Sequence, residues 1–117
     1  MSALPFSALE LAIPLDPIDP SQVRSGEPRA GFVAVDTRDG LELGIWEITP
    51  GVSTDVEADE WSVVVSGRAT VAFDDGRASM ELAAASVFRL DAGDRTTWTV
   101  HETLRKVYIT PVTGTAE

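Results

Sequence analysis

The stretch from Glu60 to Thr110 constrains the fold of this chain more than any other segment. It consists of short runs with the alternating pattern of β-strands, interrupted by turn signals at Gly67, at Asp75-Gly76 and at Gly93. Short strands at this spacing do not build a helix bundle or a parallel α/β sheet, and they are typical of a small antiparallel sandwich or barrel. Because such a barrel encloses a pocket, we expect function to depend on side chains that point inward.

Runs before residue 60 extend the same β pattern. The predicted strands cover residues 31–36, 41–48, 60–66, 68–73, 78–83, 87–90, 96–101 and 104–112. A turn that ends in Gly40 separates the first two strands, because glycine tolerates the positive φ that such turns require. Ser66-Gly67 predicts a tight hairpin, and the turn at 74–76 predicts another. The sequence therefore predicts an all-β chain without a long helix.

The chain divides into three predicted parts. Residues 1–29 form an extended N-terminal arm, residues 30–113 form the β-barrel domain, and residues 114–117 form a short tail. Two interpretations of the arm stay open. It lies over the barrel or over a partner subunit, or it is a loose tail, because chain ends are poorly ordered unless other contacts hold them.

Within the arm, proline sets the local conformation. Three prolines at every third position favour an extended path without internal hydrogen bonds (Pro14, Pro17 and Pro20). The alternation of apolar residues at 9–13 predicts a short edge strand. Asp19 is suitably placed to cap a single helical turn that starts at Pro20, since proline is accepted at the first helical position.

Composition excludes several classes of function. The chain has 117 residues, and its nine basic and nineteen acidic residues give a formal net charge of −10. This charge repels nucleic-acid phosphates and anionic membranes, so we expect neither as a partner. The absence of cysteine excludes disulfides and thiolate-bound zinc. Without an apolar run long enough to span a membrane or a basic leader, the sequence predicts a cytoplasmic protein.

Three motifs carry a resemblance to a known family. They are GIWEITPG at 44–51, DEWSVVVSGRATV at 59–71 and AGDRTTWTVHETLRKVYI at 92–109. In these motifs the chain resembles the small single-domain cupins, and among them the branch of ureidoglycine aminohydrolase and the ethanolamine-utilisation cupin. The resemblance covers residues 25–112. It implies a double-stranded β-helix, the cupin jelly-roll barrel, which usually occurs as a homodimer, and many members have no assigned function.

The resemblance also shows where this chain departs from the family. Metal-binding cupins carry three histidines and a glutamate, and Glu60 keeps the acidic position. The histidine positions hold Thr54 and Val56, or Ser53 and Asp55 with the longer spacing, and Thr96. Because transition metals in such sites depend on neutral imidazole, we predict no metal and no other cofactor. This departure makes metal-dependent cupin chemistry a poor expectation for the chain.

Glu60 is the strongest single candidate for a functional residue. It starts an otherwise apolar strand, and inside a barrel desolvation raises the pKa of a carboxyl group, which suits a general acid or base. Its alternative is a strand-end carboxylate in solvent or paired with Lys106. The other candidate ligand-binding residues are Trp46, Ser62, Thr96, Trp98, Lys106 and Tyr108.

Periodicity alone leaves the orientation of these candidates open. Trp98 shares a face with Thr96, and both line the pocket or belong to the core. Lys106 and Tyr108 share one face of the last strand, and Arg105 lies on the other. His101 is offset by one residue from the face of Trp98, so we expect it on the surface.

Three hypotheses for function follow. In the first, the barrel binds a small polar or carboxylate-bearing metabolite without a metal. In the second, the chain is a small aminohydrolase- or isomerase-type enzyme with Glu60 as acid or base. In the third, the barrel is filled by side chains such as Val56, Val64 and Val100 and serves as a structural dimer.

Overall fold

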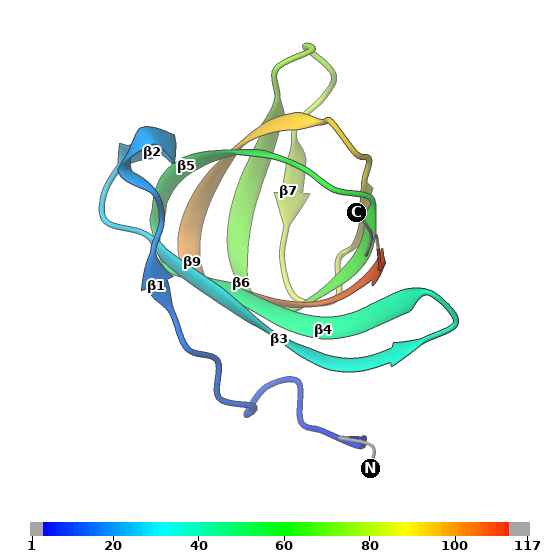
Figure 1. The fold of residues 1–117 in the computed structure, drawn as a ribbon. Helices are drawn as coiled ribbons and strands as arrows, with labels where there is room; N and C mark the ends of the chain where they lie inside the picture. Colours follow the sequence, from blue (N-terminus) through cyan, green and yellow to red (C-terminus); the bar gives the residue numbers. More distant parts are fainter. Residues whose placement is uncertain (1–3, 113–117) are drawn as a thin grey trace.

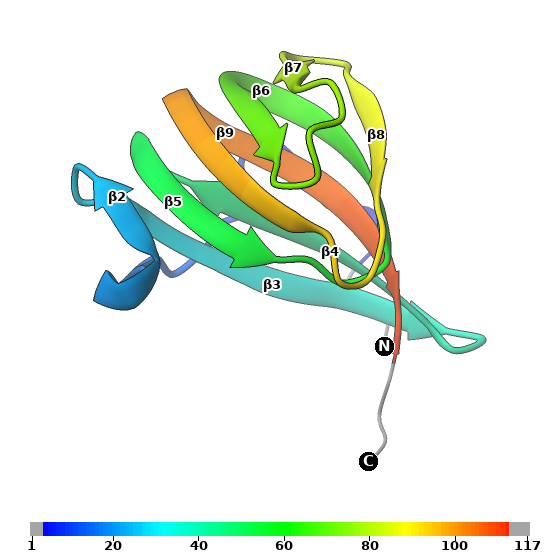
Figure 2. The ribbon, with the colours of Figure 1, turned by 90° about the horizontal axis from the view of Figure 1, so that it is seen from above.

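The computed structural model describes residues 4–112, so the predicted tail at 114–117 lies outside the described residues. These residues form one antiparallel sheet that curls into a barrel (Figures 1 and 2). The elements are β1 (Asp16–Pro17), η1 (Pro20–Gln22), β2 (Val23–Ser25), β3 (Arg29–Arg38), β4 (Leu41–Ile48), β5 (Gly51–Val56), β6 (Glu60–Phe73), β7 (Met80–Leu82), β8 (Val87–Leu90) and β9 (Arg95–Pro111). The predicted all-β class is confirmed, and η1 is the one helical turn in the described residues.

Strand β9 is the centre of the sheet. The strands follow the order β1-β3-β4-β9-β5-β2, and β6 pairs with β7, β8 and β9 outside this path. The first half of β9 pairs with β5 and its second half pairs with β4, while β6 runs beside most of its length. The inward side chains of β9 therefore lie beside those of β4, β5 and β6.

The two longest strands each replace two predicted strands. Ser66-Gly67 does not form a hairpin, because β6 continues through it. Gly67 has a φ of +91°, and a Cβ atom on it would lie 2.1 Å from the carbonyl oxygen of Thr103 in β9. The pairing register shifts between Val64 and Ala69, so the strand bends here. The hairpin prediction is wrong because a glycine that permits a bend inside a strand gives the same signal as a turn.

Other predicted turns are present. Asp39 and Gly40 have φ values of +51° and +78°, as a two-residue hairpin between β3 and β4 requires. After β6, the backbone N–H of Gly76 donates to the carbonyl of Phe73, and the chain then returns to pair β7 with β6. In both cases the turn residues determine the connection locally.

Residues 16–25 of the N-terminal segment are bound to the barrel. β1 pairs with β3, and β2 pairs with β5, so this part is not a loose tail. The helical turn η1 starts at Pro20 as predicted, and the Asp19 carboxylate accepts a hydrogen bond of 2.9 Å from the backbone N–H of Ser21. The cap and the strand pairs together fix this segment beside the barrel opening.

Residues 4–15 lie along the outside of the barrel (Figure 1). The predicted strand at 9–13 is wrong, because the N–H groups of Glu10 and Leu11 donate to the carbonyl of Ser7 in a turn. Arg105 on β9 donates to the carbonyl of Ala8 at 3.1 Å. A Cβ atom on Gly31 would lie 1.9 Å from the carbonyl oxygen of Pro14, so glycine permits this close approach.

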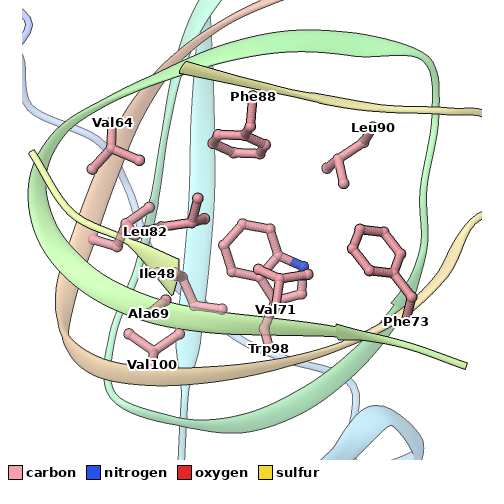
Figure 3. Packing of buried hydrophobic residues seen from close by; sticks show 11 residues of the cluster. Ile48, Val64, Ala69, Val71, Phe73, Leu82, Phe88, Leu90, Trp98 and Val100 are labelled. Carbon is pink, nitrogen blue, oxygen red and sulfur yellow. The ribbon is translucent and has the colours of Figure 1, made fainter. Parts of the chain in front are cut away.

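The hydrophobic core fills part of the barrel interior. Figure 3 shows the buried cluster, which combines aliphatic and aromatic side chains from opposite walls. Val64 and Val100 belong to it, as the filled-barrel hypothesis expected, but Val56 is exposed and does not. Ile48 and Trp98 connect this core to an open cavity described below. The barrel is thus packed on one side and hollow on the other.

In the described part of the chain, no helix has the length and hydrophobicity that crossing a membrane requires.

Candidate functional site

A cavity of about 510 Å³ opens into the barrel between the N-terminal segment, β3, β4, β5 and β9. Five predicted site residues line it: Trp46, Glu60, Trp98, Lys106 and Tyr108. The other two, Ser62 and Thr96, are buried behind this lining. All seven candidates therefore lie in or directly beside one cavity, although they come from positions up to 62 residues apart in the sequence.

An ion pair between Glu60 and Lys106 lies at the centre of the site. Lys106 Nζ donates to Glu60 Oε2, and the Ser62 hydroxyl donates to the same oxygen at 2.6 Å. The exposed fractions of the side chains are 5% for Lys106 and 15% for Glu60. Glu60 therefore points inward, and its paired state is the alternative that the sequence left open. Within the barrel, this pairing compensates much of the cost of burying both charges.

Three aromatic rings surround the Lys106 ammonium group. Its Nζ atom lies 4.6 Å from the ring centroid of Trp46, 5.3 Å from that of Trp98 and 5.4 Å from that of Phe88. The two tryptophan rings are themselves in contact, with centroids 5.3 Å apart. At these distances each ring face attracts a cation. A carboxylate and three aromatic rings thus surround Lys106, the one buried basic side chain within residues 4–112.

The last strand turns Lys106 and Tyr108 into the cavity. Their partners in register on β4 are Trp46 and Gly44, and Gly44 leaves room for the Tyr108 ring. The Tyr108 hydroxyl donates to Glu42 at 2.7 Å. Burial, together with this hydrogen bond to a carboxylate, raises the pKa of Tyr108, so its phenol stays a neutral donor at physiological pH.

Glu57 is a site residue that the sequence reasoning missed. Its Oε2 atom accepts hydrogen bonds from the Thr96 hydroxyl at 2.6 Å and from the Trp98 indole N–H at 3.0 Å. Burial raises the pKa of Glu57, the two hydrogen bonds oppose this shift, and the nearby charge of Asp55 adds to it. Extending the alternation of β5 from Ser53 through Asp55 to Glu57 provides a signal that could have found it.

Asp55 shows which of the two motif alignments the fold adopts. Ser53 is buried and Asp55 lines the cavity, whereas Val56 is exposed, so the longer spacing places residues inward. Burial raises the pKa of Asp55, and a hydrogen bond from the N–H of Val56 opposes this shift. Asp55 and Glu57 therefore form an acidic wall beside the Glu60 pair.

Other polar side chains lie outside the cavity. His101 is exposed on β9, as expected, and its Nε2 atom lies 3.0 Å from the Thr70 hydroxyl. Arg105 is on the opposite face from Lys106 and pairs with Glu47 at 2.8 Å. Arg89 faces outward with Asp59. These residues contribute to the outer surface, and no cavity contact involves them.

A family model for the EutQ-like cupin domain matches residues 36–108, which is more than half of the chain. This protein belongs to the EutQ-like cupins. The expected relationship with the ethanolamine-utilisation cupins is therefore confirmed at the level of the domain. No curated protein matches the chain in sequence.

Solved structures support the same fold. The EutQ protein of Clostridium difficile is 15% identical with a TM-score of 0.64, and the match covers 74% of this chain and 65% of that protein. A protein of unknown function from Pseudomonas syringae pv. tomato is 24% identical with a TM-score of 0.73, and the match covers 88% of this chain and 45% of that protein.

A third similar structure is a putative ethanolamine utilization protein Q from Salmonella typhimurium. It is 15% identical with a TM-score of 0.60, and the match covers 87% of this chain and 97% of that protein. At these identities the likeness shows the fold alone. The chain is a cupin-domain protein whose specific function must be argued from its own cavity.

Proposed function

We propose that this cupin binds a small polar metabolite in its barrel cavity and does so without a metal ion. The observation that carries the proposal is the Glu60–Lys106 pair. The acidic residue that the family motif supplies to the interior is already engaged by an ammonium group of the same chain. The cavity beside this pair is open and lined by aromatic and polar side chains, as binding sites for small molecules usually are.

The residues at the family's metal positions do not fit a transition metal. Ser53, Asp55 and Thr96 replace the imidazoles, and the Thr96 hydroxyl donates a hydrogen bond to Glu57. Lys106 is already paired with Glu60, so the acidic ligand of the family motif is not free for a metal. In residues 4–112 no group of three or more His, Cys, Asp or Glu side chains could hold a metal ion.

A small enzyme of the aminohydrolase or isomerase type is the second candidate. The observation in its favour is Glu57, a cavity carboxyl whose pKa is raised by burial and which can therefore hold a proton closer to neutral pH. The sequence placed this role on Glu60, but Glu60 is committed to Lys106 and Ser62. If a reaction takes place here, Glu57 is the better candidate for general acid.

Elemental analysis and ligand screening test the first proposal. We expect substoichiometric transition metal in protein purified without chelators, and no thermal stabilisation by added Mn²⁺, Fe²⁺, Ni²⁺ or Zn²⁺. A screen of small polar metabolites should raise the melting temperature of the wild type, and Glu60→Gln should abolish that response. Glu102→Gln, an exposed position on β9, is the matched control. Stoichiometric metal, or an unchanged ligand response in Glu60→Gln, would overturn the proposal.

The homodimer and the cytoplasmic location stay predictions. The homodimer is implied by the family resemblance, and size-exclusion chromatography with light scattering is the direct measurement. The location was inferred from the lack of a long apolar run and of a basic leader in the sequence, and fractionation of the source cells tests it.

A further inference from the structure

The charge of the cavity selects the kind of ligand that it can hold. Six carboxylate side chains line it, and Lys106 is the single basic side chain among the described residues of the lining. The carboxylates belong to Asp16, Asp19, Glu42, Asp55, Glu57 and Glu60. One of them is neutralised by Lys106, so the other five leave an excess of negative charge. Fields of one sign in a cleft concentrate ligands of the opposite sign.

The hydrogen-bonding capacity of the lining shows the same imbalance. Three side-chain donors of the lining are already used: the Tyr108 hydroxyl donates to Glu42, the Trp98 indole donates to Glu57, and the Gln22 amide donates to the carbonyl of Thr54. Within residues 4–112, Glu57, Asp55 and Glu60 each have one carboxylate oxygen engaged and one that accepts no hydrogen bond. These free carboxylate oxygens favour a ligand that brings hydrogen-bond donors.

The aromatic walls favour the same ligand. Trp46 and Trp98 line the cavity and lie at cation–π distance from the Lys106 ammonium, so the wall of the cavity contains aromatic rings of the kind that attract a cation. Phe32 adds an aromatic side chain to the lining from β3. An anion at the same place would face six carboxylates and rings whose faces are negative.

We propose that the ligand of this cavity is a small organic cation, a primary or quaternary amine, whose charged head binds at Asp55 and Glu57 beside the aromatic wall. This inference rests on the proposed binding function and narrows its ligand. It excludes the carboxylate-bearing metabolite that the sequence alone left open. A bound cation relieves the repulsion between Asp55 and Glu57 and occupies the free carboxylate oxygens, so binding energy comes from charges already gathered in the folded state.

The test uses a matched set of six-carbon probes on the full chain. Hexylammonium, hexanamide and hexanoate share their apolar part and differ only in the charge of the head group. Isothermal titration calorimetry at neutral pH and low salt gives each affinity. We expect hexylammonium to bind at least about tenfold more tightly than hexanamide, and hexanoate to show no binding. The hexylammonium affinity should fall as salt is added, because salt screens the charges.

Variants separate the local carboxylates from the net charge of the chain. Asp55→Asn and Glu57→Gln should each weaken hexylammonium binding by roughly tenfold. Glu102→Gln removes the same charge from the outer face and should leave the affinity unchanged. Equal weakening by Glu102→Gln would show that only the overall charge acts, and it would overturn the proposed site. Circular dichroism confirms that each variant is folded before titration.

The outcomes also distinguish this inference from the function on which it rests. If hexanamide or hexanoate binds as tightly as hexylammonium, and Glu60→Gln abolishes that binding, the cavity binds metabolites but the cation proposal is wrong. If none of the three probes binds, the cation proposal is overturned, and the metabolite screen then decides the broader function. Binding of hexylammonium alone, lost in Asp55→Asn and Glu57→Gln, supports both.

Discussion

Replacing Lys106 by methionine should destabilise the protein strongly, because it removes one partner of a buried ion pair. Methionine keeps most of the length and apolar volume of the lysine side chain, so the packing against Trp46 and Trp98 changes little. The change leaves Glu60 with the Ser62 hydroxyl as its remaining partner in the described residues. The Glu60 carboxylate then remains in the barrel without a cationic partner among the described residues.

The exposed fractions of the two side chains indicate the size of the effect. Breaking a buried pair costs about 3–5 kcal/mol, whereas an exposed pair contributes at most about 1 kcal/mol. Lys106 is 5% exposed, but Glu60 is 15% exposed and lines the cavity, so water can partly solvate it. We therefore expect a loss of about 3 kcal/mol in the free energy of unfolding. For a domain of this size that corresponds to a fall of roughly 10–15 °C in melting temperature.

Urea unfolding measures this loss, with tryptophan fluorescence and far-ultraviolet circular dichroism as two probes of one transition. The double variant Lys106→Met/Glu60→Gln should recover about 1.5 kcal/mol or more relative to the sum of the single changes, since the orphaned charge is absent. Arg68→Met, which breaks the exposed pair with Glu102, is the matched control and should cost less than about 1 kcal/mol. A loss below about 1 kcal/mol for Lys106→Met, or strict additivity in the double variant, would refute the reasoning.

Three further predictions follow from the site and from the arm. Glu57→Ala should destabilise the folded protein by about 1–3 kcal/mol, because Thr96 and Trp98 lose their hydrogen-bond acceptor. Glu57→Gln keeps an oxygen acceptor and should cost little stability. Thermal melts of both variants test this. The pKa of Glu57 is raised in the folded state, so its contribution to stability is complete at acid pH and is lost as pH rises through that pKa. The stability of the wild type relative to Glu57→Gln should therefore fall with rising pH and then level off. A flat or rising difference would contradict the assignment. Gly31→Ala should displace the N-terminal arm, since the new Cβ atom would lie 1.9 Å from the carbonyl oxygen of Pro14. We expect faster proteolysis within residues 4–15 while the barrel stays intact. Unchanged protection from proteolysis would show that the arm adapts.

Much of the fold could be predicted because its signals are local. Alternation of apolar and polar residues identified the strand regions, and Asp39-Gly40 gives a hairpin wherever its φ values are accepted. The cap at Asp19 and the helical start at Pro20 likewise depend on neighbours in sequence. The family motif likewise identified Glu60 as the strongest candidate from its position in the chain, but left open whether its side chain faces the interior or solvent.

The failed predictions concern contacts between distant segments. Position 67 requires glycine partly because the carbonyl oxygen of Thr103 lies against it, and this contact joins β6 to β9. The apolar run at 9–13 forms no strand, because its N–H groups at Glu10 and Leu11 are bound within a turn to Ser7. Propensity describes what a segment can form, and the edges available in the folded protein decide what it does form.

For this protein, the sequence alone determined the all-β class, the family and the absence of histidine from the motif positions. Each depends on residue identity and spacing within one segment. Only the tertiary structure decided that Lys106 faces Glu60, that Glu57 joins the site and that the cavity is acidic. These properties arise where strands distant in sequence meet, since Glu60 and Lys106 are 46 residues apart. The charge of a cavity depends on which faces close around it, and alternation along a strand shows two faces without showing which one is inside.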